Sequence, residues 1–314
     1  MRTILDCDPG NDDALGILVA CGHPAVELAA VTTGAGHLAH DRTARNAAIT
    51  LHLAGCGRVP VAAGAAGPLV RERLIARVLD MEHALDPERP DLLASALDPR
   101  PACDLIDGVA TAGTTVVTTG PLTNLALALR RAPGLKGRIA RIVTLGGSWG
   151  LGNKTAAAEW NILCDPEAAA AVFDSGIPIT LIPIDAANGA MISDRLIEAT
   201  RAIGGPVGAF AAELLVSLVS TFRPGVLSPS AMPLNDPVAM LVAADPRLAA
   251  TVPARVDVEL AGRHSYGRTV IDFACRDGRP ANAEVALSLD SAGIDKAFLA
   301  ALTRLAANLK KDTR

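Results

Sequence analysis

Four aspartates lie within eight residues near the N-terminus, and this spacing constrains the fold more than any other feature of the chain. They are Asp6, Asp8, Asp12 and Asp13. Residues 2–5 before them predict a short buried strand, and the apolar residues 14–20 after them predict a helix. The acids therefore belong to the turn at the carboxyl end of a strand, where open α/β sheets bind ligands.

So many carboxylates in one turn repel one another unless a positive charge lies among them. A hard divalent cation with oxygen ligands meets that need, and Ca²⁺ and Mg²⁺ are the candidates. Pro9 and Gly10 allow a tight turn, with Asp8 and Asp13 facing one point from opposite sides. A cation there would lower the pKa of a water whose proton a carboxylate could take, which predicts a hydrolase. The alternative is that Asp12 caps the following helix and the other acids are solvated.

Strand-like and helix-like segments alternate through the first two-thirds of the chain. Such alternation predicts an α/β fold with an open, mostly parallel, Rossmann-like sheet flanked by helices. The expected strands are 26–33, 59–63, 115–119, 141–145 and 177–184, and the expected helices are 41–54, 122–131 and 166–173.

Two segments depart from the alternation. Residues 82–104, rich in Asp, Pro and Arg, predict a loop or lid near the site. Residues 193–250 predict mostly helix, broken at 223–225 and 228–229. Extra C-terminal elements follow: antiparallel strands at 254–260, 268–273 and 284–289, and a last helix at 290–307. No linker marks a boundary, so we expect a single domain over residues 1–314.

Composition excludes several classes of protein. Half of the residues are hydrophobic and 20% are charged, which favours a large core and argues against disorder. With a net charge of −4 and no long basic run, we expect no nucleic-acid partner. No apolar run reaches transmembrane length, and the first strand leaves no room for a signal peptide. The six cysteines are far apart and predict free thiols in a reducing compartment, so we expect a cytoplasmic protein.

Several motifs carry a resemblance to one family. The first is 6–14, Asp-Cys-Asp-Pro-Gly-Asn-Asp-Asp-Ala, which resembles the signature of the inosine-uridine-preferring nucleoside hydrolases. Other segments resemble that family in the same order along the chain: 119–124, 146–147, 152–153, 158–161, 165–169, 235–237, 267–272 and Asn282. The resemblance implies the nucleoside hydrolase fold and Ca²⁺-dependent cleavage of the N-glycosidic bond of ribonucleosides, giving ribose and free base. It also implies a role in purine or pyrimidine salvage and a homodimer or homotetramer.

The resemblance also implies which residues act. Asp8 would be both a metal ligand and the general base, with Asp13, Asp236 and the carbonyl of Thr119 as further ligands of Ca²⁺. The substrate-binding residues would be Asp12, Asn153, Glu159, Asn161 and Leu145. We expect Glu159 and Asn161 to lie in an extended segment, where alternate side chains point the same way. An exposed polar strand face is the alternative for that segment.

The residues expected to contact the base depart from the family pattern. Asn235 stands where many relatives carry a His that helps the base to leave, and Asn can only form hydrogen bonds. His37 stands where many relatives carry Asn, and it either assists the leaving group or fills the space. We include both as candidate catalytic residues. Residues 81–84 are a possible remnant of a family loop, and 221–223 occupy the region where some relatives place Tyr over the base.

Two other functions compete with hydrolysis. The first is a ribose-binding or nucleoside-binding protein of the same fold with little or no turnover, which Asn235 mildly favours. The second is a phosphotransfer enzyme that uses the acids with Mg²⁺, and the lack of a Gly-rich phosphate loop argues against it.

Overall fold

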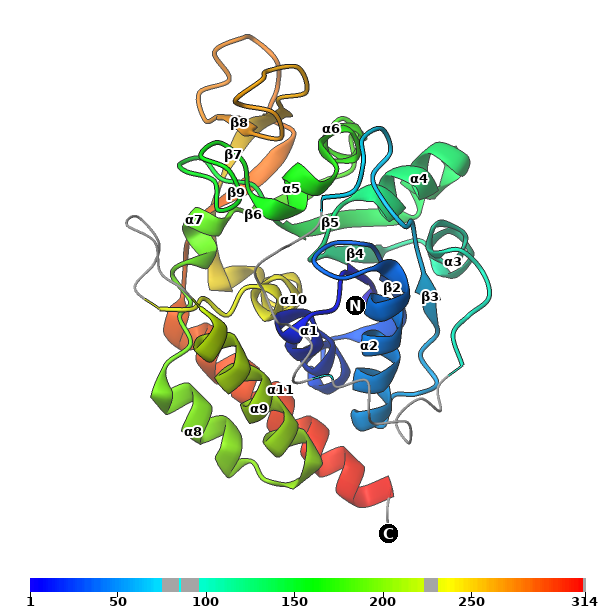
Figure 1. The fold of residues 1–314 in the computed structure, drawn as a ribbon, viewed down its shortest axis with the longest axis vertical. Helices are drawn as coiled ribbons and strands as arrows, with labels where there is room; N and C mark the ends of the chain where they lie inside the picture. The colour runs from blue at the N-terminus through cyan, green and yellow to red at the C-terminus, as the bar shows by residue number, and fades with distance from the viewer. Residues whose placement is uncertain (75–84, 86–95, 223–230, 313–314) are drawn as a thin grey trace.

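The computed structural model describes residues 1–74, 85, 96–222 and 231–312. Within these ranges one nine-stranded sheet runs through the molecule, in the order β3-β2-β1-β4-β5-β6-β9-β7-β8 (Figure 1). The parallel strands of its first part are β1 (Arg2–Cys7), β2 (Glu27–Thr33), β3 (Val61–Ala63), β4 (Thr114–Thr118), β5 (Ile139–Leu145) and β6 (Ile179–Ile182). The remaining strands are β7 (Ala249–Val258), β8 (Thr269–Asp272) and β9 (Ala283–Leu289).

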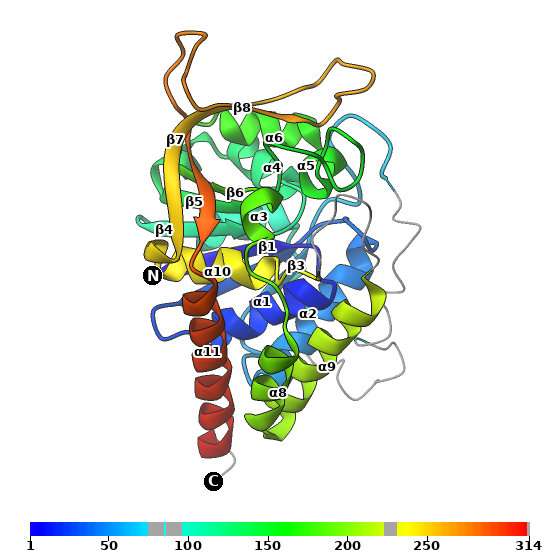
Figure 2. The same ribbon diagram turned by 90° about the vertical axis from the view of Figure 1, so that its left-hand side faces the viewer.

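Helices cover both faces of the sheet, as Figure 2 shows. On one face lie α1 (Asn11–Gly22), α2 (His40–Leu53), α10 (Asp236–Ala244) and α11 (Ser291–Asp312), with α8 (Asp194–Ala202) and α9 (Gly205–Thr221) packed on them. On the other face lie α3 (Ala102–Val109), α4 (Thr123–Arg131) and α6 (Pro166–Phe173). The short elements are η2 (Pro133–Gly137), α5 (Trp160–Cys164), α7 (Ile184–Ala187) and η3 (Pro246–Leu248). The mostly parallel α/β fold predicted from the sequence is thus confirmed.

The central parallel strands are largely buried on both faces, and they consist mainly of apolar residues and Thr. All five residues of β4 are buried, for example. The helix α1 is apolar all around because it packs between α2, α9, α10 and α11. Gly22 is required at its end, since a Cβ there would lie 2.1 Å from the carbonyl oxygen of Ala301 in α11.

The chain order places a switch point in the middle of the sheet. From β1 the chain moves outward through β2 and β3, and it then returns to the other side of β1 as β4 before continuing to β5 and β6. Crevices at such switch points, at the carboxyl ends of the strands, are where open α/β sheets bind ligands. Asp8 follows β1 and Thr119 follows β4 at this position.

Several expectations need correction. β9 was expected to be antiparallel, but it pairs parallel with β6 on one side and antiparallel with β7 on the other. The strand expected at 177–184 is shorter, because Pro183 begins the turn into α7. The last helix continues to Asp312. Most of the expected lid at 82–104 and both expected breaks after α9 lie outside the described residues, although 102–104 begin α3.

Two further sequence expectations can be compared with the structure. None of the helices in the described ranges is long and apolar enough to cross a membrane. All six cysteines lie in the described part of the chain and are free thiols. The continuous sheet is consistent with one domain over 1–314, which stays a prediction.

Candidate active site

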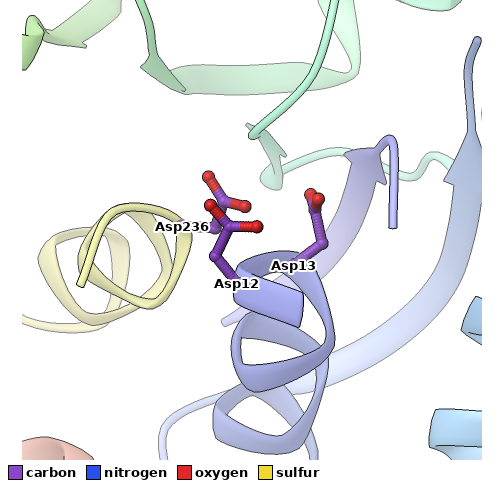
Figure 3. A group of neighbouring side chains, drawn as sticks. All are labelled: Asp12, Asp13 and Asp236. Atoms are coloured by element: carbon purple, nitrogen blue, oxygen red, sulfur yellow. The ribbon is translucent and has the colours of Figure 1, made fainter. Parts of the chain in front are cut away.

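Three carboxylates from distant parts of the chain converge at the switch point. Asp12 and Asp13 lie in the first turn of α1, and Asp236 is the first residue of α10 (Figure 3). One ligand oxygen of each lies within 4.8 Å of the other two. Asp13 and Asp236 are buried and Asp12 is partly buried. We call these three residues the acidic group.

The charges of the acidic group are poorly compensated by protein atoms. Burial raises the pKa of Asp13 and of Asp236 well above the ordinary value, and the neighbouring carboxylates raise both pKa values further. Donors from Gly10 and Thr119 partly oppose this for Asp13, and the helix N-termini add some positive potential. Carboxylate oxygens arranged in this way fit a hard divalent cation, which would replace mutual repulsion with attraction.

Asp8 lies beside the acidic group and is 3% exposed. Its charge raises the pKa of all three members, although it is not itself within the 4.8 Å set. The main-chain N–H of His37 donates to its Oδ2 (3.1 Å). Gly36 and Gly120 pack against the same carboxylate, since a Cβ on either would lie 1.7 Å or 2.5 Å from an Asp8 oxygen. The carboxylate is therefore closely confined.

Thr119 contacts both a predicted metal ligand, Asp13, and a predicted substrate-binding residue, Asn161. Its hydroxyl donates to Oδ1 of Asp13 (2.7 Å). Its carbonyl oxygen accepts from Nδ2 of Asn161 (2.8 Å), and the same amide also donates to the carbonyl of Leu145 (3.1 Å). The carbonyl of Leu145 thus helps to orient Asn161, while the predicted part of Leu145 in substrate binding stays a prediction.

The segment around Glu159 is not extended, so that expectation was wrong. Glu159 is the N-cap of α5, and its carboxylate accepts from the main-chain N–H groups of Gly147, Asn161 and Ile162. Because Glu159 caps the N–H groups of Asn161 and Ile162, a helix begins at Trp160. The alternation of polar residues at 159 and 161 does not reveal this helix. Burial raises the pKa of Glu159, and the three main-chain donors oppose that shift. Asn153 accepts from the main-chain N–H of Trp160 (3.0 Å).

His37 lies in an aromatic stack that the sequence did not predict. Its ring stacks on Trp160 with centroids 4.3 Å apart and planes inclined by 20°. Nδ1 of His37 is 3.7 Å from Oδ2 of Asp8. The ammonium of Lys154 lies 4.5 Å from the centroid of the Trp160 ring. Trp160 belongs to the 158–161 segment, which resembles the family, but nothing in the sequence predicts that it stacks on His37.

Asn235 has an uncommon backbone conformation, with φ 51° and ψ −109°. Its side chain hydrogen-bonds Asp12, which opposes the burial that raises the pKa of that carboxyl. The structure therefore places Asn235 against the acidic group, whereas its predicted contact with the base is untested.

Asp6 and Asn124 form a buried network beneath the site. Oδ1 of Asp6 accepts from Thr32 (2.7 Å) and from Asn124 (2.9 Å). Burial raises the pKa of Asp6 to about 7. Asn124 also accepts from the main-chain N–H of Ala65, so the network connects β1, β2 and the segment after β3. Asp6 was recognised in the acidic turn and Asn124 in the 119–124 motif, but sequence reasoning gave neither a role.

Two regions that were discussed from the sequence lie wholly or partly outside the described residues. Residues 81–84 lie outside the described part of the chain, as does 223 of the 221–223 segment. Thr221 ends α9 and Phe222 follows it.

Known proteins resemble this chain in both sequence and structure. A family model described as inosine-uridine preferring nucleoside hydrolase matches residues 3–296. The chain is 41% identical over 295 residues to a pyrimidine-specific ribonucleoside hydrolase of Photobacterium profundum, covering 92% of this chain and 94% of that one. It is 40% identical over 296 residues to the corresponding enzyme of Escherichia coli, with 92% and 94% covered. A solved structure of a purine-preferring ribonucleoside hydrolase from Gardnerella vaginalis superposes with a TM-score of 0.89 at 30% identity, covering 98% of this chain and 99% of that one.

Proposed function

Because the chain belongs to the inosine-uridine preferring nucleoside hydrolase family and is an N-glycosyl hydrolase of ribonucleosides, we propose that it releases ribose and free base in a Ca²⁺-dependent reaction in which Asp8 takes the proton of the attacking water. The observation that carries this proposal is the convergence of the acidic group beside the buried Asp8 at the switch point of the sheet. A binding protein without turnover is not favoured, since the relatives are named as hydrolases.

The metal would be held by Asp8, Asp13, Asp236 and the carbonyl of Thr119, with Asp12 close enough to contribute. Seven or eight oxygen ligands, some from the sugar, suit Ca²⁺ better than Mg²⁺. When bound, the ion would supply positive charge that lowers the pKa of a neighbouring water and orients the sugar hydroxyls.

Asp8 is suited to general-base work because it is confined. Its carboxylate is fixed by the His37 N–H and by the two flanking glycines, so little reorganisation is needed when it accepts a proton. The other carboxylates would favour the positive charge that develops on the sugar as the N-glycosidic bond breaks.

Ribose recognition would fall to the predicted set Asp12, Asn153, Glu159 and Asn161, with Leu145 acting through its carbonyl on Asn161. Both oxygens of Glu159 already accept main-chain donors, yet a carboxylate has about four acceptor positions and retains capacity for a sugar hydroxyl.

For the departing base we propose that His37 assists and that Asn235 contributes hydrogen bonding only. His37 is partly exposed beside Asp8, whereas the Asn235 side chain is engaged with Asp12. The names of the relatives suggest pyrimidine ribonucleosides as the preferred substrates. A salvage role, a cytoplasmic location and a homodimer or homotetramer complete the proposal.

Release of ribose from a panel of purine and pyrimidine ribonucleosides tests this function, with metal removed by chelation and then Ca²⁺, Mg²⁺ or Zn²⁺ restored. We expect Ca²⁺ to restore the highest rate and Asp8→Ala to release no ribose even at saturating Ca²⁺. Full activity in chelator, or turnover by Asp8→Ala near the parent rate, would contradict the proposed chemistry.

A further inference from the structure

The loop after β2 contacts the carboxylate that we assign as general base, and His37 of that loop stacks on Trp160 from a distant segment. The His37 N–H donates to Oδ2 of Asp8, and Gly36 packs against the same oxygen. The His37 ring also lies near this carboxylate, with Nδ1 3.7 Å from Oδ2 of Asp8. One face of the ring stacks on Trp160, with centroids 4.3 Å apart.

Trp160 is itself held firmly. It is 3% exposed and is the first residue of α5, directly after the Glu159 cap. Its main-chain N–H donates to Asn153, and Lys154 lies over its ring. A buried indole of this kind provides an apolar surface for a partly exposed imidazole, whose side chain is 29% exposed.

We propose that Trp160 is a positioning residue for hydrolysis, which orients Asp8 by holding His37 and its main-chain N–H against the carboxylate. The inference rests on the proposed role of Asp8. It assigns no proton transfer to Trp160, and it requires only that His37 be kept in place.

Loss of the stack should affect the chemical step more than substrate binding. Moving a catalytic carboxylate by about 1 Å can lower the reaction rate up to about a hundredfold, because the rate depends steeply on the placement of the reacting groups. An interaction that matters mainly in the transition state lowers kcat and leaves KM nearly unchanged. A generally loosened fold would instead change both constants and lower Tm.

The test is a double-mutant cycle on kcat and KM with Trp160→Met, His37→Ala and the pair together, measured at saturating Ca²⁺. Methionine fills much of the indole volume but does not stack. We expect Trp160→Met to lower kcat at least about tenfold with KM within about threefold, and the pair to be no slower than His37→Ala alone within about twofold. Trp160→Phe keeps a ring and should recover most of the loss.

The control is Trp149→Leu, which removes the other tryptophan of the chain. Trp149 packs edge-on against Phe273 at 6.1 Å rather than on His37, so kcat should stay near the parent value. If Trp160→Met does not fold, Trp160→Leu replaces it in the cycle. Independent, multiplying losses for Trp160 and His37, or a Trp160→Met enzyme as active as the Trp149→Leu control, would overturn the inference. Asp8→Ala, assayed in parallel, separates the two proposals: if it is inactive while Trp160→Met is fully active, only the positioning inference fails.

Discussion

Replacing Gly36 by alanine should disable the enzyme while leaving most of the fold intact. A Cβ at this position would lie 1.7 Å from Oδ2, 2.4 Å from Cγ and 2.8 Å from Cβ of Asp8. Real Cβ atoms essentially never approach other heavy atoms closer than 3.0 Å, so the carboxylate and the loop must separate by about 1.3 Å. Rotation of the Asp8 side chain does not remove the clash, because the Cβ of Asp8 is also too close.

The size of the effect follows from this displacement. A shift of about 1 Å at a reacting group can cost about a hundredfold in rate, equivalent to about 2.7 kcal/mol of transition-state stabilisation. Overpacking a buried position typically costs about 1–3 kcal/mol of folding stability, which a domain of this size can tolerate. We therefore expect kcat/KM for ribose release to fall about a hundredfold and Tm to fall by a few degrees.

Gly34→Ala is the matched control in the same loop. A Cβ there would meet only Nδ2 of Asn124, at 3.6 Å, which is ordinary van der Waals contact. Both variants are compared with the parent for ribose release, Ca²⁺ affinity and thermal unfolding. If Gly36→Ala hydrolyses ribonucleosides at the parent rate, the close confinement of Asp8 has no role in catalysis and the reasoning is refuted.

Three further predictions concern the metal, Asn235 and an ion-pair network. Ca²⁺ should raise Tm by relieving repulsion within the acidic group, and Asp236→Asn should lose most of that increase; an equal increase in both proteins, measured by calorimetry, would contradict the assignment. Asn235→Gly should keep Tm near the parent value, because glycine accepts φ 51°, and should raise KM, because the contact with Asp12 is lost. Asn235→Ala should also lose about 1 kcal/mol of stability. Equal Tm values for the two variants would show that the backbone at this position is not strained. Burial raises the pKa of Asp257, but Arg255 and Arg279 outweigh burial and lower it. These ion pairs therefore stabilise the fold above the unfolded pKa near 3.8, and their contribution is lost as the pH falls through the lower pKa of the folded state. The difference in unfolding free energy between parent and Asp257→Asn should therefore be small at pH 6, under about 1 kcal/mol, and should shrink further toward pH 3. A difference that grows in acid would reverse the assigned sign.

The sequence was most informative where local patterns and chemistry agree. The acidic turn could be placed between β1 and α1 because the residues before it suit a buried strand and those after it suit an apolar helix. The convergence of Asp236 on that turn was predicted only through the family resemblance, since nothing local at Asp236 distinguishes a ligand from a helix cap.

Other features depend on contacts that no local pattern encodes. The conformation at Glu159 depends on a carboxylate that binds three main-chain N–H groups, including that of Gly147 in another segment. The place of β9 between β6 and β7 depends on pairing with strands from both halves of the chain. The stack of His37 on Trp160 joins a loop and a helix start that are far apart in the sequence, and each residue alone resembles an ordinary site-lining side chain.

The packing of α11 on α1 has a consequence for how the protein is made. Gly22 lies against the carbonyl of Ala301, and α11 covers an apolar side of the helix whose first turn carries Asp12 and Asp13. During synthesis, α1 emerges from the ribosome long before α11, so the side of α1 that α11 covers stays exposed until α11 has also been translated. The acidic turn therefore gains its final support late in folding, and the proposed metal site reaches its final form only after α11 has packed on α1.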